Sequence, residues 1–316
     1  MLEKSPLSER RIDIVTVLFG GEAALMKVQA KSIARFIEES CIGRIFIIVN
    51  ELAPESTYAA LQRDVLPAYG ELLSRIEIVP FFRLMRPHVA ADGFRVGQAL
   101  RLLASRIVSS ASYLILDPKT HFMRPMGYSS FAEPKSSKLR TYKMRRLTSG
   151  IQEYEAALAY FEASTPEFFM PTRAPFVFKT LLLRQMLDEI ETREGAHFDD
   201  FFVSNGCVMQ DLPLYQAWIL AKAGGFEEHY RFGSRNGVGI FARNPSNDEG
   251  MDEVLSNLLA EATQTFSLHR KRINTLTVAQ WDRIAASWVQ AGLCGDANEA
   301  SGMVNDLKAS AELVAR

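Results

Sequence analysis

The residues best suited to ligand chemistry stand directly after runs of apolar residues. Phe19–Glu22 follows one such run, Asn50–Glu51 follows the next, and Asp117–His121 follows a later one. In an open parallel sheet, ligands bind beyond the carboxyl ends of the strands, so these segments are the first candidates for a site. The glycines at 20 and 21 lack the G-x-G-x-x-G spacing, and G-x-x-x-x-G-K-[ST], G-x-S-x-G and H-E-x-x-H are absent. Dinucleotide, P-loop, nucleophile-elbow and zinc-protease enzymes are therefore disfavoured.

Alternating hydrophobic periods predict the elements that position these segments. Continuous apolar runs predict buried strands, and spacing of three to four residues predicts helices between them. The strands are expected at 12–18, 44–50, 76–79 and 113–116, and the helices at 22–39, 54–66 and 94–109. This alternation is typical of a mostly parallel sheet covered on both faces. We therefore expect an α/β fold with an open, mostly parallel sheet.

The pattern is looser after the fourth strand. The basic stretch Lys135–Arg146 and its neighbours predict an irregular stretch or a loop over 129–146, and three prolines predict a loop over 165–175. Helices are expected at 149–163 (with Ser149 as N-cap), 178–191, 211–223 and 253–262, strands at 237–241 and 265–268, and helices at 278–291 and 298–314. We expect a flexible N-terminus over 1–10, one domain over 11–276, and a helical C-terminal appendage over 277–316.

Composition excludes several classes of protein. The 316 residues include 36 Lys and Arg against 37 Asp and Glu, which disfavours a surface built for duplex nucleic acid. Hydrophobic residues make up 47% of the chain, so wholesale disorder is excluded. Cys41, Cys207 and Cys294 are far apart and predict neither a zinc site nor a disulfide framework. With no secretory signal evident, we expect a cytoplasmic protein, and contact with the inner membrane surface stays an alternative.

The most specific pattern lies between Gly93 and Pro125. GFRVGQALRLLASRIVSSASYLILDPKTHFMRP reads as a helix, a polar break, an apolar strand ending in Asp, and a short element ending in Arg-Pro. It resembles the core of a bacterial family of glycosyltransferases with a GT-A fold and largely uncharacterised function. That family's pattern is a G-W-x-x-Q-Q-x-L-K-L helix and a strand ending L-D-x-D-x-x-F-x-R-P. The opening strands and helix, DLPLY at 211–215 and SLHR at 267–270 are also similar to it, so the likeness covers residues 10–292.

The resemblance implies a GT-A-like fold and a donor site made by the matched residues. It implies that Asp117 contacts the ribose or diphosphate, and that His269 and Arg270 hold the diphosphate. Gln98 and Arg101 are three residues apart and share a helix face, so both could face the cleft. Simpler interpretations stay open: Asp117 caps a loop, Arg101 faces outward, and residues 269–272 are the basic start of an ordinary helix.

Lys119 departs from the family pattern. It stands where the second acidic residue of the D-x-D pair is expected, and that pair implies Mg²⁺ or Mn²⁺ at the sugar-nucleotide diphosphate. A protonated lysine cannot bind a metal ion. Either its ammonium replaces the ion's charge beside the leaving diphosphate, or the site is degenerate. We therefore assign no metal ligands and regard a divalent cofactor as doubtful.

Asp211 is the candidate general base that deprotonates an acceptor hydroxyl. The alternative is a carboxylate stabilised by a helix N-terminus, which would lower its pKa and weaken it as a base. Asp199 and Asp200 form a competing acidic pair, for which a solvated turn is the simpler interpretation. His121 could assist near the diphosphate or lie exposed in a loop. Lys135–Arg146 could meet an anionic acceptor or membrane headgroups, or be a solvated loop.

These observations lead to one main hypothesis and two alternatives. The main one is a glycosyltransferase that moves a sugar from a UDP- or GDP-sugar to a hydroxyl of a glycan or lipid-linked acceptor, in bacterial surface polysaccharide or glycolipid synthesis. The second is a degenerate glycosyltransferase-like binding or scaffold protein. The third is a nucleotidyltransferase, disfavoured because a glycine-rich phosphate loop is absent. Donor sugar, acceptor, stereochemical outcome and oligomeric state are left undetermined.

Overall fold

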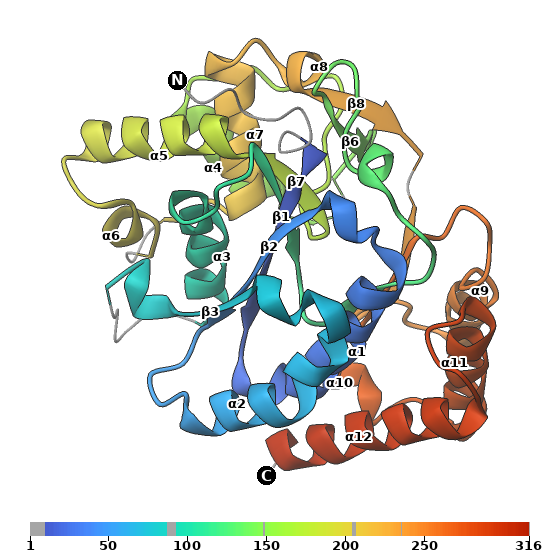
Figure 1. The fold of residues 1–316 in the computed structure, drawn as a ribbon. Helices are drawn as coiled ribbons and strands as arrows, with labels where there is room; N and C mark the ends of the chain where they lie inside the picture. Colours follow the sequence, from blue (N-terminus) through green and yellow to red (C-terminus); the bar gives the residue numbers. More distant parts are fainter. Residues whose placement is uncertain (1–9, 87–92, 148, 204–206, 235, 316) are drawn as a thin grey trace.

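A computed structural model describes residues 10–86, 93–147, 149–203, 207–234 and 236–315. Most of the N-terminal segment expected to be flexible, 1–10, lies outside these described residues. Figure 1 shows a central sheet with helices on both sides and the C-terminal helices along one edge. Within the described part of the chain, no helix has the length and apolar character needed to cross a membrane.

The central sheet has five strands in the order β3-β2-β1-β4-β7. β1, β2, β3 and β4 run parallel to one another, whereas β7 pairs antiparallel with β4. The strands span Ile12–Leu18 (β1), Ile42–Val49 (β2), Ile76–Pro80 (β3), Ser112–Leu116 (β4) and Phe176–Lys179 (β7). The α/β fold class with a mostly parallel open sheet is thus confirmed.

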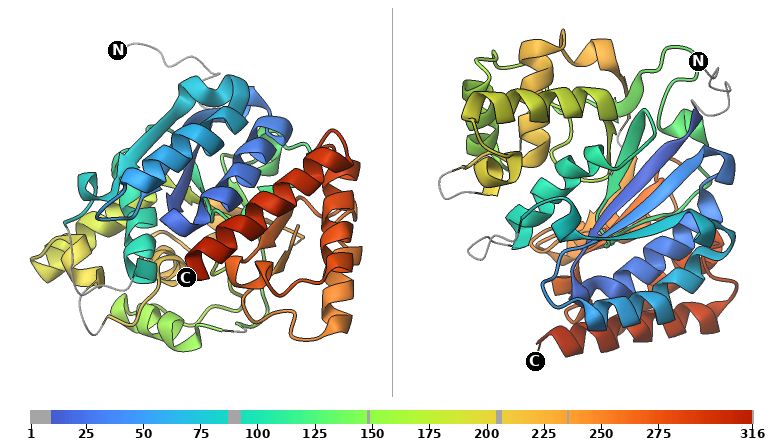
Figure 2. Two further views of the ribbon diagram at one scale, coloured as in Figure 1. Left: turned by 90° about the horizontal axis from the view of Figure 1, so that it is seen from below. Right: turned by 60° about the vertical axis from the view of Figure 1, so that its left-hand side comes forward.

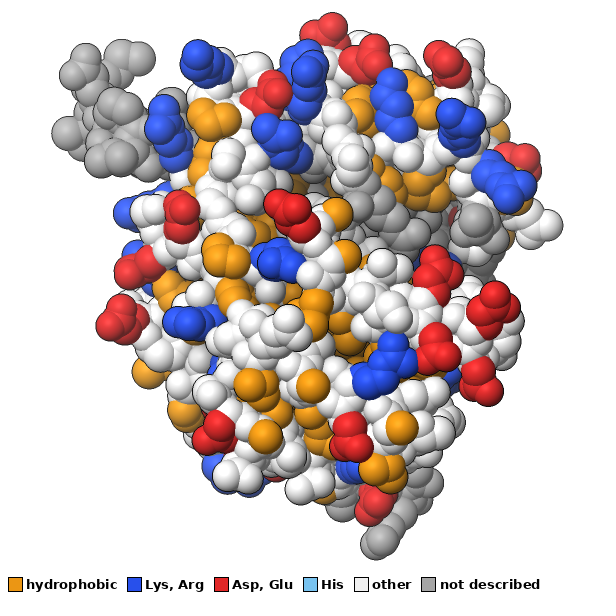
Figure 3. All heavy atoms as spheres, turned by 90° about the vertical axis from the view of Figure 1, so that its right-hand side faces the viewer, with side chains coloured by type: hydrophobic (Ala, Val, Ile, Leu, Met, Phe, Trp, Pro, Cys, Tyr) orange, Lys and Arg blue, Asp and Glu red, His pale blue; other side chains and the backbone are white. Residues whose placement is uncertain are grey.

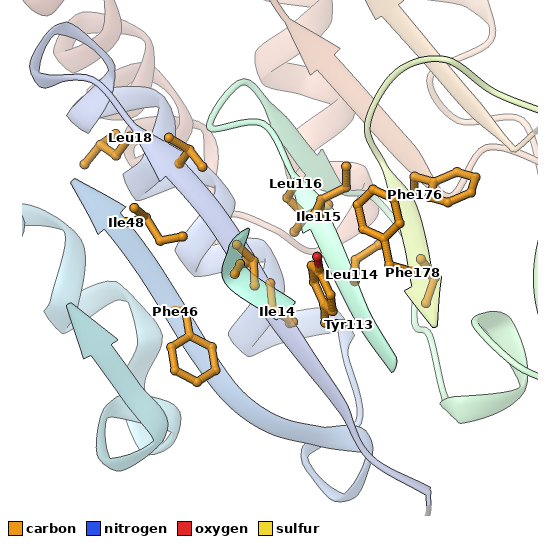
Figure 4. Close-up of a cluster of buried hydrophobic side chains, with 14 of the residues drawn as sticks. Ile14, Leu18, Phe46, Ile48, Tyr113, Leu114, Ile115, Leu116, Phe176 and Phe178 are labelled. Carbon is orange, nitrogen blue, oxygen red and sulfur yellow. The ribbon is translucent and has the colours of Figure 1, made fainter. Parts of the chain in front are cut away.

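The central strands are mostly apolar because both sheet faces are buried, and the polar Asp13, Thr16 and Ser112 are buried with them. Every residue of β1 and β4 is buried, and side chains from β1, β2, β4 and β7 pack together in Figure 4. The right-hand view of Figure 2 shows α1 (Ala23–Phe36), α2 (Glu55–Ala60) and α12 (Ala297–Ala315) on one side of the sheet. On the other side lie α3 (Gly93–Leu103), α4 (Ile151–Tyr160), α5 (Thr180–Glu194), α6 (Phe198–Val203) and α7 (Asp211–Lys222).

A second sheet continues from the end of β4. Its order is β5-β10-β9. β5 (Thr120–Phe122) pairs antiparallel with β10 (Thr265–Leu268), and β9 (Gly237–Ile240) pairs parallel with β10. Next to it, β6 (Leu139–Tyr142) and β8 (Tyr230–Gly233) form a parallel pair. The remaining helices are α8 (Phe226–His229), α9 (Asp248–Ser256), α10 (Arg270–Ile273) and α11 (Val278–Ala291).

The structure corrects three details of the sequence analysis. The helix expected at 178–191 begins at Thr180, because Phe178 and Lys179 belong to β7. Gly150, in the left-handed region at φ 74°, occupies the N-cap of α4, so the Ser149 cap is wrong. β6 lies inside 129–146, so this stretch is not loop throughout.

The C-terminal helices are those expected, and α12 packs against α1. Lys27 pairs with Asp306 at 2.7 Å, and Lys31 forms an ion pair with Glu299. The tail thus covers the helix that follows β1. The expected boundary of the appendage at residue 277 stays a prediction.

Candidate functional site

A tight turn at the carboxyl end of β4 carries the central candidates. The amide of Thr120 donates to the Asp117 carbonyl at 2.9 Å, which closes the turn. Below it, the buried Gln29 of α1 donates from Nε2 to the carbonyls of Asp117 (2.7 Å) and Thr120 (2.9 Å). Gln29 Oε1 accepts from Thr16 Oγ1 of β1 at 2.9 Å. Gln29 was not predicted as a site residue, and its one signal in the sequence was a polar residue on the apolar face of the first helix.

Arg101 links the turn to the start of α7. Its Nη1 donates to Asp117 Oδ1 at 3.1 Å, and its Nε lies 2.8 Å from Asp211 Oδ2. Burial acts to lower the pKa of Arg101, but Asp211 and Asp117 more than offset this, and the pKa is raised. Arg101 therefore faces inward as a guanidinium between two carboxylates.

Lys119 covers the other side of the Asp117 carboxylate. Its ammonium pairs with Asp117 Oδ2, and both side chains keep 22% of their surface exposed. Burial acts to raise the pKa of Asp117, but Lys119 and then Arg101 outweigh it, so the pKa lies below its usual value. Asp117 is thus an ionised carboxylate held between two cations.

Asp211 lies in the first turn of α7 and is almost fully buried, with 2% of its side chain exposed. Burial raises its pKa, while Arg101 and the helix backbone act in the opposite direction. A raised pKa suits a general base. However, the carboxylate faces Arg101 and not open solvent, so the base role stays a prediction that requires Arg101 to move.

His269 and Arg270 lie beside this turn. The Leu268 amide donates to the Lys119 carbonyl at 2.9 Å, which places the end of β10 against the turn. His269 is the N-cap of α10, where its Nδ1 accepts from the Lys271 amide at 3.2 Å. Burial and then Lys119 lower the pKa of His269 to about 4, so its imidazole is neutral at physiological pH.

Glu22 faces the same cations from the end of β1. Burial raises its pKa, and the nearby Lys119 and Arg270 act against this rise. Beside it, a cavity of about 420 Å³ is lined by Gly21, Arg270, Lys271 and residues of α12. Glu51, a candidate after the second strand, instead accepts from the Gly20 amide and the Thr57 hydroxyl. It therefore braces the glycine turn.

Gln98 is buried on α3. Its Oε1 has no hydrogen-bond partner among the described residues. No hydrogen bond joins it to Asp117 or Lys119 in the part of the chain that the structure describes. Its donor-binding role stays a prediction.

His121 lies away from this site. It is buried, and its Nε2 accepts from Trp288 Nε1 of α11 at 2.9 Å. Phe266 also packs against its ring, and burial lowers its pKa to about 3. His121 is therefore a neutral core residue, neither an exposed loop histidine nor a group near the site.

Asp199 and Asp200 also have structural partners. They lie in the first turn of α6, and Asp199 is buried, so the expected solvated turn is wrong for it. Its Oδ2 accepts from the Arg86 amide at 2.9 Å, and the Arg86 guanidinium pairs with Asp200. These contacts account for the second acidic pair without catalysis.

The residues present do not fit a divalent metal ion. Each Asp117 oxygen is already paired with a cation, Arg101 or Lys119. Across the described residues, no three His, Cys, Asp or Glu side chains lie close enough to hold an ion. No catalytic step is therefore assigned to a metal.

Comparisons with solved structures give distant similarity to glycosyltransferases. An active-site mutant of LgtC is 10% identical over 81% of this chain and 87% of its own, with a TM-score of 0.47. The galactosyltransferase LgtC with donor and acceptor sugar analogues is 13% identical over 93% and 95%, with a TM-score of 0.46. Apo WbbM, a bifunctional glycosyltransferase, is 11% identical over 82% and 46%, with a TM-score of 0.46.

Among curated proteins there is no match. The model of a family of unknown function, DUF6492, matches residues 18–244, which is more than half of the chain. The chain therefore belongs to the DUF6492 family.

Proposed function

We propose that this protein is a glycosyltransferase that moves a sugar from a nucleotide-sugar donor to a hydroxyl acceptor, on a growing polysaccharide or a glycolipid. The observation that carries the proposal is the ammonium of Lys119, held on Asp117 at the carboxyl end of β4 with His269 and Arg270 beside it. Loss of a nucleoside diphosphate leaves negative charge on the leaving group, and fixed cations stabilise such charge.

The proposed roles follow from the contacts. Lys119 and Arg270 bind the diphosphate, the neutral His269 donates or accepts a hydrogen bond there, and Asp117 orients Lys119. Asp211, paired with Arg101, is the candidate base. Its carboxylate becomes available to an acceptor hydroxyl only when Arg101 turns toward the bound donor.

Titration calorimetry with UDP and GDP, with and without Mn²⁺, tests the donor site. We expect binding of at least one nucleotide without metal, weakened roughly tenfold or more in Lys119→Met, since a charged contact contributes about 1.5–3 kcal/mol. Lys222→Met removes an exposed lysine paired with Glu189 at 3.4 Å and serves as the matched control. Lys119→Met should change the unfolding free energy by at most about 1 kcal/mol, because its ion pair is partly exposed.

Two outcomes would contradict the proposal. One is the absence of binding of either nucleotide at millimolar concentration. The other is nucleotide binding that occurs only when Mn²⁺ is present, because the Lys119 ammonium would then not replace the ion.

The burial of Asp211 behind Arg101 favours a second candidate, a nucleotide-sugar-binding protein without turnover. The two candidates differ in the products formed from UDP- and GDP-sugars. Release of UDP or GDP that is lost in Asp211→Asn indicates transfer. Binding with no release, together with an Asp211→Asn variant that keeps full biological function, indicates the binding protein. Release of pyrophosphate would instead indicate a nucleotidyltransferase.

A further inference from the structure

A second cavity, of about 470 Å³, lies on the open face of the β5-β10-β9 sheet. Phe122, Thr265 and Ser267 of that sheet line it, and α11 covers the opposite face, where Trp288 meets His121. The other walls come from β6, from the loop before β7, and from Ser234 and Asn236 between β8 and β9. The volume lies in the range of ligand pockets.

This cavity begins next to the Lys119 site. Ser267 Oγ lies 2.8 Å from Thr120 Oγ1, so the lining of the cavity contacts the last residue of the turn. Lys119 precedes Thr120, and His269 follows Ser267 by two residues. A group bound in the cavity is therefore adjacent to the proposed diphosphate site.

The lining suits a hydroxylated ligand. It combines polar groups with aromatic rings, as sugar-binding surfaces do, and contains no Asp or Glu among the described lining residues. The polar members include Ser129, Ser130, Thr141, Asn236 and Gln264, and the aromatic ones include Phe131, Tyr142 and Phe241.

Two arginines give the cavity a positive charge. Arg140 of β6 and Arg173 both line it, and no carboxylate of the described residues lies within ion-pairing distance of either. Arg173 donates to Ser149 Oγ at 2.9 Å, and its guanidinium lies 5.8 Å from the centre of the Phe241 ring. On the face in Figure 3, lysines and arginines are interspersed with Asp and Glu over the upper part, where β6 and β8 lie in Figure 1.

Neighbouring cations are already neutralised. Lys143 pairs with Glu227 at 3.2 Å, and Arg231 with Glu133 at 3.5 Å. Arg140 and Arg173 therefore differ from them in keeping an uncompensated charge at a concave surface. A guanidinium binds carboxylate and phosphate groups in a paired geometry.

We propose that this cavity is the acceptor site and that it takes a sugar carrying a carboxylate or a phosphate. This inference rests on the proposed glycosyltransferase function and adds the charge class of the acceptor. The acidic group lies between Arg140 and Arg173, and the sugar hydroxyls meet the polar side chains of the lining. The acceptor hydroxyl then points along β10 toward Lys119.

Saturation-transfer NMR titrations of the full chain test this assignment with glucuronate, glucose 6-phosphate and neutral glucose as probes. We expect at least one acidic sugar to bind roughly tenfold more tightly than glucose, as one charged contact provides. The preference should be lost in Arg140→Gln and in Arg173→Gln. Arg145→Gln removes the same charge from the same basic stretch, outside the cavity lining, and should retain it.

Several outcomes would overturn the assignment. These are equal binding of acidic and neutral sugars, no sugar binding, or a preference that survives both cavity variants. Binding of phosphatidylglycerol vesicles that needs Arg140 and Arg173, without sugar binding, would assign the arginines to a membrane surface instead. UDP and GDP titrations of the same variants are independent: if nucleotides bind normally while acidic sugars do not, only the acceptor inference fails.

Discussion

The segment from Asp117 to Phe122 has a buried side and an open side. The two sides differ in whether all of their charged groups are paired within the protein. On the buried side, Gln29 bonds the turn, and Arg101 lies between Asp117 and Asp211. On the open side, Lys119 is partly exposed and pairs with the Asp117 carboxylate, and Arg270 is exposed. The buried contacts are fixed by folding, whereas on the open side Arg270 has no ion-pair partner among the described residues and lies near the paired Lys119.

The largest expected effect comes from breaking the buried ion pairs. Arg101→Met leaves Asp211 buried without its cation, and losing one partner of a buried pair costs about 3–5 kcal/mol. We expect a loss of this size in the free energy of unfolding measured with urea. The double variant Arg101→Met/Asp211→Asn should recover part of it, because no buried charge is then left unpaired.

Arg106→Met is the matched control for this prediction. Arg106 follows α3 closely and pairs with Glu191 at 2.7 Å, but 36% of its side chain is exposed. Such a pair contributes at most about 1 kcal/mol. If Arg101→Met were as mild as Arg106→Met, the contrast between a buried and an open side would not hold.

Two histidines give a second prediction: His121 lies within the segment, and His269 directly follows β10. His121, on the buried side, has its pKa lowered to about 3, and His269, at the open side, to about 4. Both pKa values lie below the usual 6.5 of histidine. Between pH 6.5 and the lowered pKa, the unfolded chain therefore binds a proton that the folded chain does not. Each histidine therefore lowers stability as the pH falls below about 6.5.

Urea unfolding at a series of pH values measures this effect. His121→Gln keeps a hydrogen-bond acceptor for Trp288 but cannot titrate, so its stability should fall less steeply on acidification. His269→Gln should flatten the curve less, because this side chain is only partly buried. An equal response of the two variants would remove the distinction between the buried and the open histidine.

Long apolar runs made the central strands predictable, since every residue of β1 and β4 is buried. β5, β6 and β8 are three or four residues long, and without a long apolar run they carry no periodic signal. Their position depends on pairing with distant segments, which local sequence does not encode.

The same limit applies to the candidate site. Asp117, Lys119 and His269 could be named because they follow strands or match a family pattern. Gln29 was missed, because a polar residue within a helix usually faces solvent, whereas Glu22 lies in the candidate segment named after the first strand. His121 was expected near the diphosphate or exposed in a loop. Its aromatic partners Trp288 and Phe266 are far away along the chain, so the local sequence does not indicate its burial.

At Gln29 we expect a loss of stability smaller than that of Arg101→Met, and this residue tests whether the buried side positions the open one. Gln29→Leu removes the donors to the carbonyls of Asp117 and Thr120, and unsatisfied buried groups of this kind cost about 1–3 kcal/mol. Because Lys119 lies within that turn, we also expect weaker binding of UDP or GDP by titration calorimetry. The control is Ser32→Ala, one turn along α1, which removes the acceptor of the Phe122 amide at 3.0 Å and leaves the turn intact. Ser32→Ala should therefore lose stability without losing nucleotide affinity. If Gln29→Leu behaved in the same way, the position of Lys119 would depend on Asp117 and on the Leu268 amide, and Gln29 would only stabilise the fold.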